Sequence, residues 1–231
     1  GATSSVINCV FDGNKAFEAD YLNTVYVVGD QQVTQNSEEY QFLTRGGAIT
    51  IDPNSTIENF SNIVFKNNGG CALDIGRNTS VYVKDCVFEN NYDWQKTFLD
   101  FYLQPERVLQ LYEQYYPEAL TISAGAVFIG EDCRNVVFEN CSFNKNFSKT
   151  YGGAINAKSD FTAINCSFGA NEAEANGGAI DMYYYIPDPN TRTLEMTLTM
   201  CTFADNKAGN WGGAIHTQNF EGTFNQCYFI N

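Results

Sequence analysis

Three polar residues of this 231-residue chain occupy equivalent places in a repeated pattern, namely Asn156, Asp181 and His216. Each follows a glycine-rich phrase and one isoleucine, and in stacked parallel strands such residues lie side by side. An aspartate beside a histidine can support acid–base catalysis, as acids and bases do on the faces of polysaccharide-cleaving β-helix enzymes. The alternative is an exposed ion pair, which contributes about 0–1 kcal/mol.

The surroundings of this row favour the second interpretation. No serine or cysteine nucleophile stands beside Asp181 and His216, and no cluster of Lys or Arg faces them to bind uronic acids. We therefore predict outward-facing side chains, no catalytic residue and no enzymatic activity. The cysteine spacings match no zinc site and no loop has the ligand spacing of a calcium site, so no metal and no cofactor are predicted. The same position is held in the other copies by Thr50, Asp74 and Phe128.

Two phrases that alternate along the chain must position these residues. The first, C-x-F-x-x-N, occurs five times in full, once with Ile63 in place of cysteine, and a last time where the chain ends. The second, G-G-A-I, is intact at residues 46–49, 152–155, 177–180 and 212–215, with variants at 70–73 and 124–127. Repetition at a fixed period is the signature of a solenoid.

Each repeat contains three short stretches of period-2 apolar alternation separated by turn residues. A short strand that buries one face needs neighbours on both edges, which stacked repeats provide. We predict an all-β fold, a single-stranded parallel β-helix of about six to seven coils with three strands per coil. Phenylalanine and cysteine should point inward in columns, and the asparagine should form a buried amide ladder at a turn. The glycine pair should supply a backbone conformation that a Cβ forbids.

Three insertions interrupt the repeats, at residues 15–45, 92–123 and 183–193. The first contains a predicted strand over 24–28, and the second a short predicted helix over 105–113, opened by proline. Aromatic residues are frequent in all three. They either pack on the scaffold or form a lateral binding platform. Trp94, Tyr183, Tyr184 and Tyr185 are the candidate binding residues.

Five cysteines fall in one column on consecutive coils: Cys86, Cys141, Cys166, Cys201 and Cys227. Cys9 shares this column, in which Ile63 shows that the slot is small and apolar. Stacked residues have nearly parallel Cβ directions, which strains a disulfide. Free buried thiols are therefore expected, with disulfides as the rival in an oxidising setting.

The charge of −14 and the pI near 4.3 argue against a nucleic-acid partner and against anionic membranes. No apolar run is long enough for a transmembrane segment. Six N-x-[ST] sequons occur. Asn54 and Asn78, in predicted turns, are the candidates for N-glycosylation if the source is eukaryotic, whereas Asn146 should be internal.

The alternation of GGA[ILV] with FxxN resembles the repeats of the polymorphic membrane protein family, best known from chlamydial surface proteins. This resemblance covers almost all of the chain outside its insertions. It implies an autotransporter-like passenger, that is, a right-handed β-helical adhesin outside the cell. Two features depart from the family: no outer-membrane barrel follows, and the insertions are long.

Together these observations predict one extracellular β-helix domain over residues 1–231, a segment of a longer solenoid or a stacking subunit. It would act in adhesion or as a structural unit of a surface assembly or filament. The expected partner is a protein or glycan of a host or neighbouring cell, or further copies of the chain stacked end to end. A carbohydrate-binding or carbohydrate-active protein is the alternative.

Overall fold

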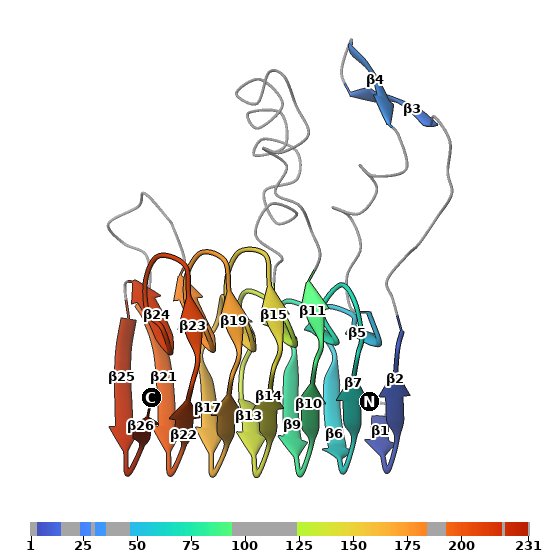
Figure 1. Ribbon diagram of the computed structural model, residues 1–231. Coiled ribbons are helices and arrows are strands. Elements are labelled where there is room, and N and C mark those ends of the chain that lie inside the picture. Colours follow the sequence, from blue (N-terminus) through green and yellow to red (C-terminus); the bar gives the residue numbers. More distant parts are fainter. Residues whose placement is uncertain are drawn as a thin grey trace.

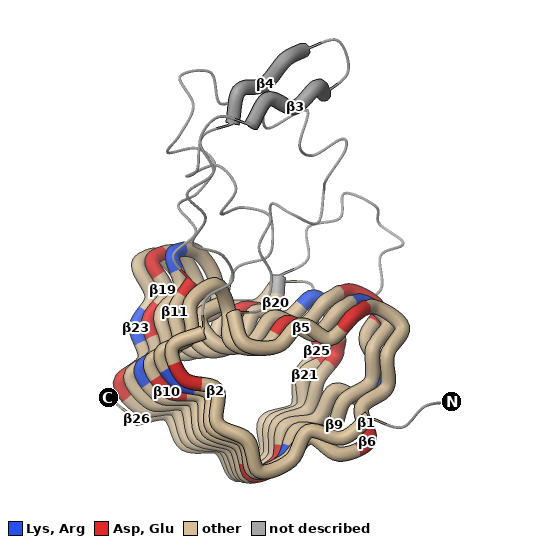
Figure 2. The backbone as a smooth tube through the Cα atoms, turned by 90° about the vertical axis from the view of Figure 1, so that its right-hand side faces the viewer, with Lys and Arg blue, Asp and Glu red and all other residues tan. Residues whose placement is uncertain are grey.

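The computed structural model describes residues 4–14, 24–28, 31–35, 47–93, 124–183, 193–218 and 220–230, with the backbone alone for 24–28, 31–35 and 183. Every element in these ranges is a strand. The strands form a parallel β-helix, as the sequence predicts, whose rungs follow one another along a single axis (Figure 1). Seen along that axis the rungs superpose, and acidic and basic residues gather at its corners (Figure 2).

Three parallel sheets run the length of the solenoid. The first sheet contains β1 (Ser4–Ile7), β6 (Thr56–Ser61), β9 (Ser80–Lys84), β13 (Val136–Glu139), β17 (Phe161–Ile164), β21 (Leu194–Thr199) and β25 (Phe220–Asn225). The second contains β2 (Val10–Asp12), β7 (Val64–Lys66), β10 (Val87–Glu89), β14 (Ser142–Asn144), β18 (Ser167–Gly169), β22 (Thr202–Ala204) and β26 (Tyr228–Ile230). The third contains β5 (Ile49–Ile51), β8 (Leu73–Ile75), β12 (Val127–Ile129), β16 (Ile155–Ala157), β20 (Ile180–Tyr183) and β24 (Ile215–Gln218).

A fourth, short sheet corrects the prediction of three strands per coil. It contains β11 (Tyr92–Asp93), β15 (Phe147–Ser148), β19 (Glu172–Ala173) and β23 (Lys207–Ala208). These strands lie in the short link between the asparagine and the glycine pair. Backbone groups in that link need hydrogen-bond partners, and they find them in the same link of the next rung.

The strand bounds also correct two of the insertion bounds. Tyr92 and Asp93 belong to β11, so the second insertion begins after Asp93. Tyr183 ends β20, so the third begins after it. The strand predicted over 24–28 is confirmed as β3 (Thr24–Val28), which pairs in antiparallel fashion with β4 (Gln31–Gln35). The helix predicted over 105–113 lies outside the described residues.

Phenylalanine and asparagine form the predicted inward columns. Consecutive phenylalanine rings of the second sheet stack 4.6–5.1 Å apart and within 11° of parallel. The asparagine three residues later forms a ladder in which each Nδ2 donates to the Oδ1 of the next asparagine, at 2.9–3.0 Å. Four central members are buried, including Asn146 as predicted: Asn68, Asn91, Asn146 and Asn171.

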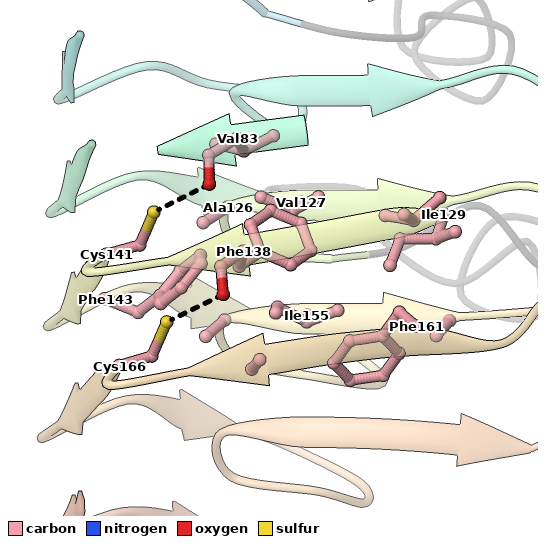
Figure 3. Close-up of a cluster of buried hydrophobic side chains, with 14 of the residues drawn as sticks. Val83, Ala126, Val127, Ile129, Phe138, Cys141, Phe143, Ile155, Phe161 and Cys166 are labelled. Carbon is pink, nitrogen blue, oxygen red and sulfur yellow. Dashed lines mark hydrogen bonds between the residues drawn. The ribbon is translucent and has the colours of Figure 1, made fainter. Parts of the chain in front are cut away.

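The cysteine column lies at the bend between the first and second sheets. All eight cysteines are free thiols, in agreement with the predicted column of free thiols. The Cys166 thiol donates to the Phe138 carbonyl of the preceding rung at 3.5 Å, and Cys141 donates to Val83 at 3.6 Å (Figure 3). The residue before each column cysteine has positive φ, as Asn140 (53°) and Asn165 (52°) illustrate. The thiols thus help to satisfy carbonyl groups at a sharp bend.

The glycine pairs fit the rungs closely together. Gly152, the first of its pair, has a φ of +62°, which a side chain disfavours. A Cβ on Gly153, the second, would lie 2.7 Å from the Glu172 backbone nitrogen in β19. The pair therefore both turns the chain and lets it approach the fourth sheet.

Candidate functional site

The row predicted from Asn156, Asp181 and His216 exists on the third sheet. Asn156 is in register with Asp181, and Asp181 with His216, so the three lie on consecutive rungs. The Asp181 Oδ1 atom is 2.6 Å from the His216 Nδ1 atom. The predicted neighbours are therefore confirmed.

The prediction that this row faces solvent is wrong from Asp74 onward, whereas Thr50 at its start is exposed. Asp74, Asn156 and Asp181 have no exposed surface, Phe128 is 5% exposed, and the His216 side chain is 15% exposed. Leu73, Val127 and Ile155 precede Asp74, Phe128 and Asn156 on their strands and point into the main core. Because side chains alternate along a strand, the row points to the other face of the third sheet, and that face is buried as well. The pair is accordingly a largely buried one, where a charge is costly unless it is partnered.

The short fourth sheet lies beside this row. Asp93 of β11 and Asp74 of β8 both raise the pKa of the Cys71 thiol through their charges, although burial is the larger cause. The two buried carboxyl groups therefore converge on one buried thiol. Cys71 also packs with Ala124 and Phe128 in a small apolar cluster separate from the main core. Phe128 of the row is thus part of this second, smaller cluster of buried residues.

Burial raises the pKa of Asp181, while Lys158 and His216 oppose that rise. Lys158 follows β16 and is itself 7% exposed. Burial lowers its pKa to about 8, against the opposing charges of Asp181 and Glu131. A buried ammonium and a buried carboxyl group thus influence each other between neighbouring rungs.

The Trp211 ring stacks on the His216 imidazole, with ring centroids 5.8 Å apart. Trp211 is 66% exposed. Asp181 fixes the orientation of an imidazole that lies beneath an exposed aromatic ring. This arrangement can hold or move a proton at His216, and it places an aromatic surface where a sugar or protein group could pack.

The aromatic candidates lie mostly outside the described residues, namely Trp94, Tyr184 and Tyr185. Tyr183 lies in β20, where it is in register with Gln218 of β24. In the part of the chain that the structure describes, no group of three or more His, Cys, Asp or Glu side chains could hold a metal ion.

The two glycosylation candidates are exposed in turns, as predicted. Asn54 and Asn78 both have positive φ, at 64° and 53°. The Asn78 Nδ2 group donates to Asn54 Oδ1 at 2.9 Å. They border a surface pocket that sequence reasoning missed, lined also by Arg77, Asp132 and Arg134. The two arginines come from turns of different length, at 76–79 and 130–135, so no regular spacing in the sequence relates them.

The fold and the repeated residues define a class, the repeat-built parallel β-helix in which an asparagine ladder and a glycine turn recur on every rung. The sequence model of the Chlamydia polymorphic membrane protein (Chlamydia_PMP) repeat matches residues 140–158 and 200–218. The resemblance to the repeats of this family is thus confirmed at these two stretches. Each match runs from the bend before the cysteine, through FxxN and GGAI, to the third sheet.

The family match points to a surface-exposed, autotransporter-like repeat protein. Neither a curated protein nor a solved structure matches the chain. Within the described ranges, no helix is long and apolar enough to cross a membrane.

Proposed function

We propose that this chain is part of an extracellular scaffold at the cell surface that acts in adhesion and has no enzymatic activity. The repeat family supports the location. A structural unit of a surface assembly is the nearest variant of this function, because it would use the same scaffold with copies of the chain as partners.

One observation carries the proposal: the polar side chains that recur along the solenoid use their hydrogen-bonding groups to hold neighbouring rungs together. Each of the four buried ladder asparagines donates from its Nδ2 group to a phenylalanine carbonyl and to the next asparagine, as Asn146 does with Phe88 and Asn171. The column thiols donate to backbone carbonyls. Repeated residues of this kind build a rigid support, and function then belongs to whatever the support presents.

The Asp181–His216 pair favours a second candidate, a carbohydrate-active protein, because Asp181 orients the imidazole as an acid–base pair requires. Its burial opposes this candidate, since substrate would have to reach Asp181 through the covering groups. The two candidates differ in their products. An adhesin leaves a bound glycan intact, whereas a hydrolase or lyase releases new reducing ends.

Deletion of residues 95–120, with a short turn as replacement, tests adhesion. Beads coated with the full chain should attach to cells, and beads coated with the deletion variant should attach at least tenfold less. The circular dichroism spectrum and the thermal midpoint should show that the β-helix remains folded. A matched deletion of residues 185–191 serves as the control for the general effect of shortening an insertion.

Undiminished attachment by a folded deletion variant would contradict the role of the second insertion in adhesion. New reducing ends from a panel of polysaccharides, abolished in Asp181→Asn, would instead establish the enzymatic candidate. Labelling of intact source cells with an antibody tests the location independently of both.

A further inference from the structure

The turns that follow the third sheet are stacked on three successive rungs. The Asn54 N–H donates to the Arg77 carbonyl at 3.0 Å, and the Asn78 N–H donates to the Glu131 carbonyl at 2.9 Å. Asn54, Asn78 and Asp132 all adopt positive φ, between 53° and 64°. Backbone hydrogen bonds and a shared positive φ thus hold the three turns against one another, which gives the kind of rigid support that binding requires.

A pocket of about 570 Å³ opens on this platform. Its lining side chains are all polar: Asn54, Arg77, Asn78, Asp132 and Arg134. The chain has five arginines and a net charge of −14. Both arginines that lie in the described ranges line this one pocket, so its lining carries a positive balance of charge on a strongly acidic protein.

The two guanidinium groups differ in their partners. Arg77 Nη2 is 3.3 Å from Asp132 Oδ2, in an ion pair whose side chains are 49% and 69% exposed. Such an exposed pair is weak and can exchange for a ligand. The Arg134 side chain forms no hydrogen bond and no ion pair with any described residue, although its backbone N–H donates to Thr79. Its guanidinium is thus available to an oxyanion, which it can bind with two parallel hydrogen bonds.

The asparagines supply the neutral part of the site. The hydrogen bond from Asn78 Nδ2 to Asn54 Oδ1 fixes both amides. It does not use the Asn54 Nδ2 group or the Asn78 Oδ1 atom, which leaves one donor and one acceptor for a ligand. Together with the Asp132 carboxylate, these groups match the hydroxyl groups of a sugar ring, which both donate and accept.

We propose that this pocket binds a carboxylate-bearing sugar, that is, a uronic-acid residue of an acidic glycan. The carboxylate would lie against Arg134, with Arg77 beside it, and the ring hydroxyls would face Asp132, Asn54 and Asn78. All five lining side chains then have a partner. A peptide ligand fits less well, because no apolar side chain lines the pocket to anchor it. The inference deepens the proposed adhesive function by naming a ligand class, and it concerns a surface distinct from the Asp181–His216 row.

A matched pair of oligosaccharides tests the carboxylate. The full chain, produced in a host that does not N-glycosylate it so that Asn54 and Asn78 stay bare, is titrated with tetragalacturonate and with its fully methyl-esterified form. Isothermal titration calorimetry at low ionic strength should detect binding of the acid and at least tenfold weaker binding of the ester. Raised salt should weaken binding of the acid.

A matched pair of variants tests the location. Arg134→Gln should weaken tetragalacturonate binding at least tenfold and leave the thermal midpoint unchanged, since the native guanidinium has no described partner. Lys145→Gln removes one positive charge from an exposed position at a different turn and should leave binding unchanged. Equal affinity for acid and ester, no binding of either, or equal loss in the two variants would overturn the inference. None of these outcomes touches the surface location or the role of the insertions, which antibody labelling and the deletion variant test separately.

Discussion

Two columns that are buried over their central rungs run along this solenoid, and they differ in almost every other respect. The asparagine ladder holds the same residue on every rung and satisfies its amides by hydrogen bonds of 2.9–3.0 Å. The row on the third sheet changes at every rung, from Thr50 to His216, and includes the charged Asp74 and Asp181. The repeated asparagines hold the rungs in register. The residues of the varied row are not needed for that register, so each can have a separate role on its own rung. The comparison therefore separates residues that maintain the fold from residues available for function.

The largest expected effect is the loss of a ladder member. Asn146→Ala removes four buried hydrogen bonds, to the Phe88 carbonyl, to the Asn171 Oδ1 atom and from the two nitrogens of Asn91. The Asn171 Oδ1 atom keeps the Asn146 backbone N–H, and Asn91 Nδ2 keeps the Phe65 carbonyl. A lost hydrogen bond costs about 0.5–1.5 kcal/mol, and the buried Asn91 N–H, which loses its Oδ1 acceptor, costs about 1–3 kcal/mol, so the free energy of unfolding should fall by roughly 4 kcal/mol or more. Chemical denaturation measures this loss. Ser142→Ala, in β14 of the same rung, is the control and should change stability by less than about 0.5 kcal/mol.

The next largest effect belongs to Lys158, beside the varied row, and depends on pH. The pKa of Lys158 is about 8 in the folded chain, against an ordinary value of 10.5. Between these two values the unfolded chain holds a proton on Lys158 that the folded chain does not, so the contribution of Lys158 to stability should rise with pH across this window. The difference corresponds to about 3 kcal/mol at most. Burial raises the pKa of the Cys71 and Cys133 thiols, whose contribution falls with pH, so the Lys158 contribution is measured as a difference between variants.

The difference in free energy of unfolding between Lys158→Met and the wild-type chain should shift by up to about 3 kcal/mol in favour of the wild type from pH 7 to pH 10.5. Denaturation at pH 7, 9 and 10.5 measures it. The same difference for Lys145→Met, at an exposed position, should not change with pH. A difference for Lys158→Met that is independent of pH would contradict the lowered pKa.

A smaller effect is expected in the cysteine column. Cys166→Ala gives up the thiol contacts with the Phe138 and Ile164 carbonyls, at 3.5 and 3.4 Å, and leaves a small cavity. Sulfhydryl groups are weak donors, so we expect a loss of about 1–2 kcal/mol. Titration of the unfolded, unreduced wild-type chain should find eight thiols, and a count of zero would contradict the column of free thiols.

The smallest effect is expected for an exposed ion pair of the fourth sheet. Lys207 Nζ lies 2.8 Å from Glu172 Oε1, with side chains 71% and 46% exposed. Solvent screens such pairs strongly. Lys207→Ala should therefore leave the midpoint of denaturation unchanged within error, and a clear shift would show that the short sheet depends on its ion pairs.

The fold could be predicted from sequence because its determinants are local and repeated. Each copy of FxxN and GGAI specifies the same turn, so the internal place of Asn146 followed from the pattern alone. The burial of Asp181 did not. Alternation on a strand indicates which residues point to opposite sides, but it does not indicate what covers the second side.

The arginine-lined pocket escaped prediction for a different reason. Arg77 and Arg134 are 57 positions apart because an insertion separates their rungs, and their turns differ in length. Only the stacking of backbone groups, such as Arg134 N–H on the Thr79 carbonyl, brings the turns together. Residues outside the repeated phrases carry no periodic signal, so their neighbours come from three-dimensional structure.

The most direct test of the distinction between the two columns is a side-by-side denaturation of Asn146→Ala and Asp181→Asn. Asn156 already fills the equivalent place on the rung before Asp181, and an asparagine oxygen can still accept a hydrogen bond from His216. At pH 9, above the Lys158 pKa of about 8, the buried ammonium no longer needs the Asp181 charge. We predict that at this pH Asp181→Asn changes the free energy of unfolding by no more than about 1 kcal/mol, whereas Asn146→Ala lowers it by roughly 4 kcal/mol or more. Equal losses in the two variants would contradict the claim that the repeated column maintains the fold and the varied one does not.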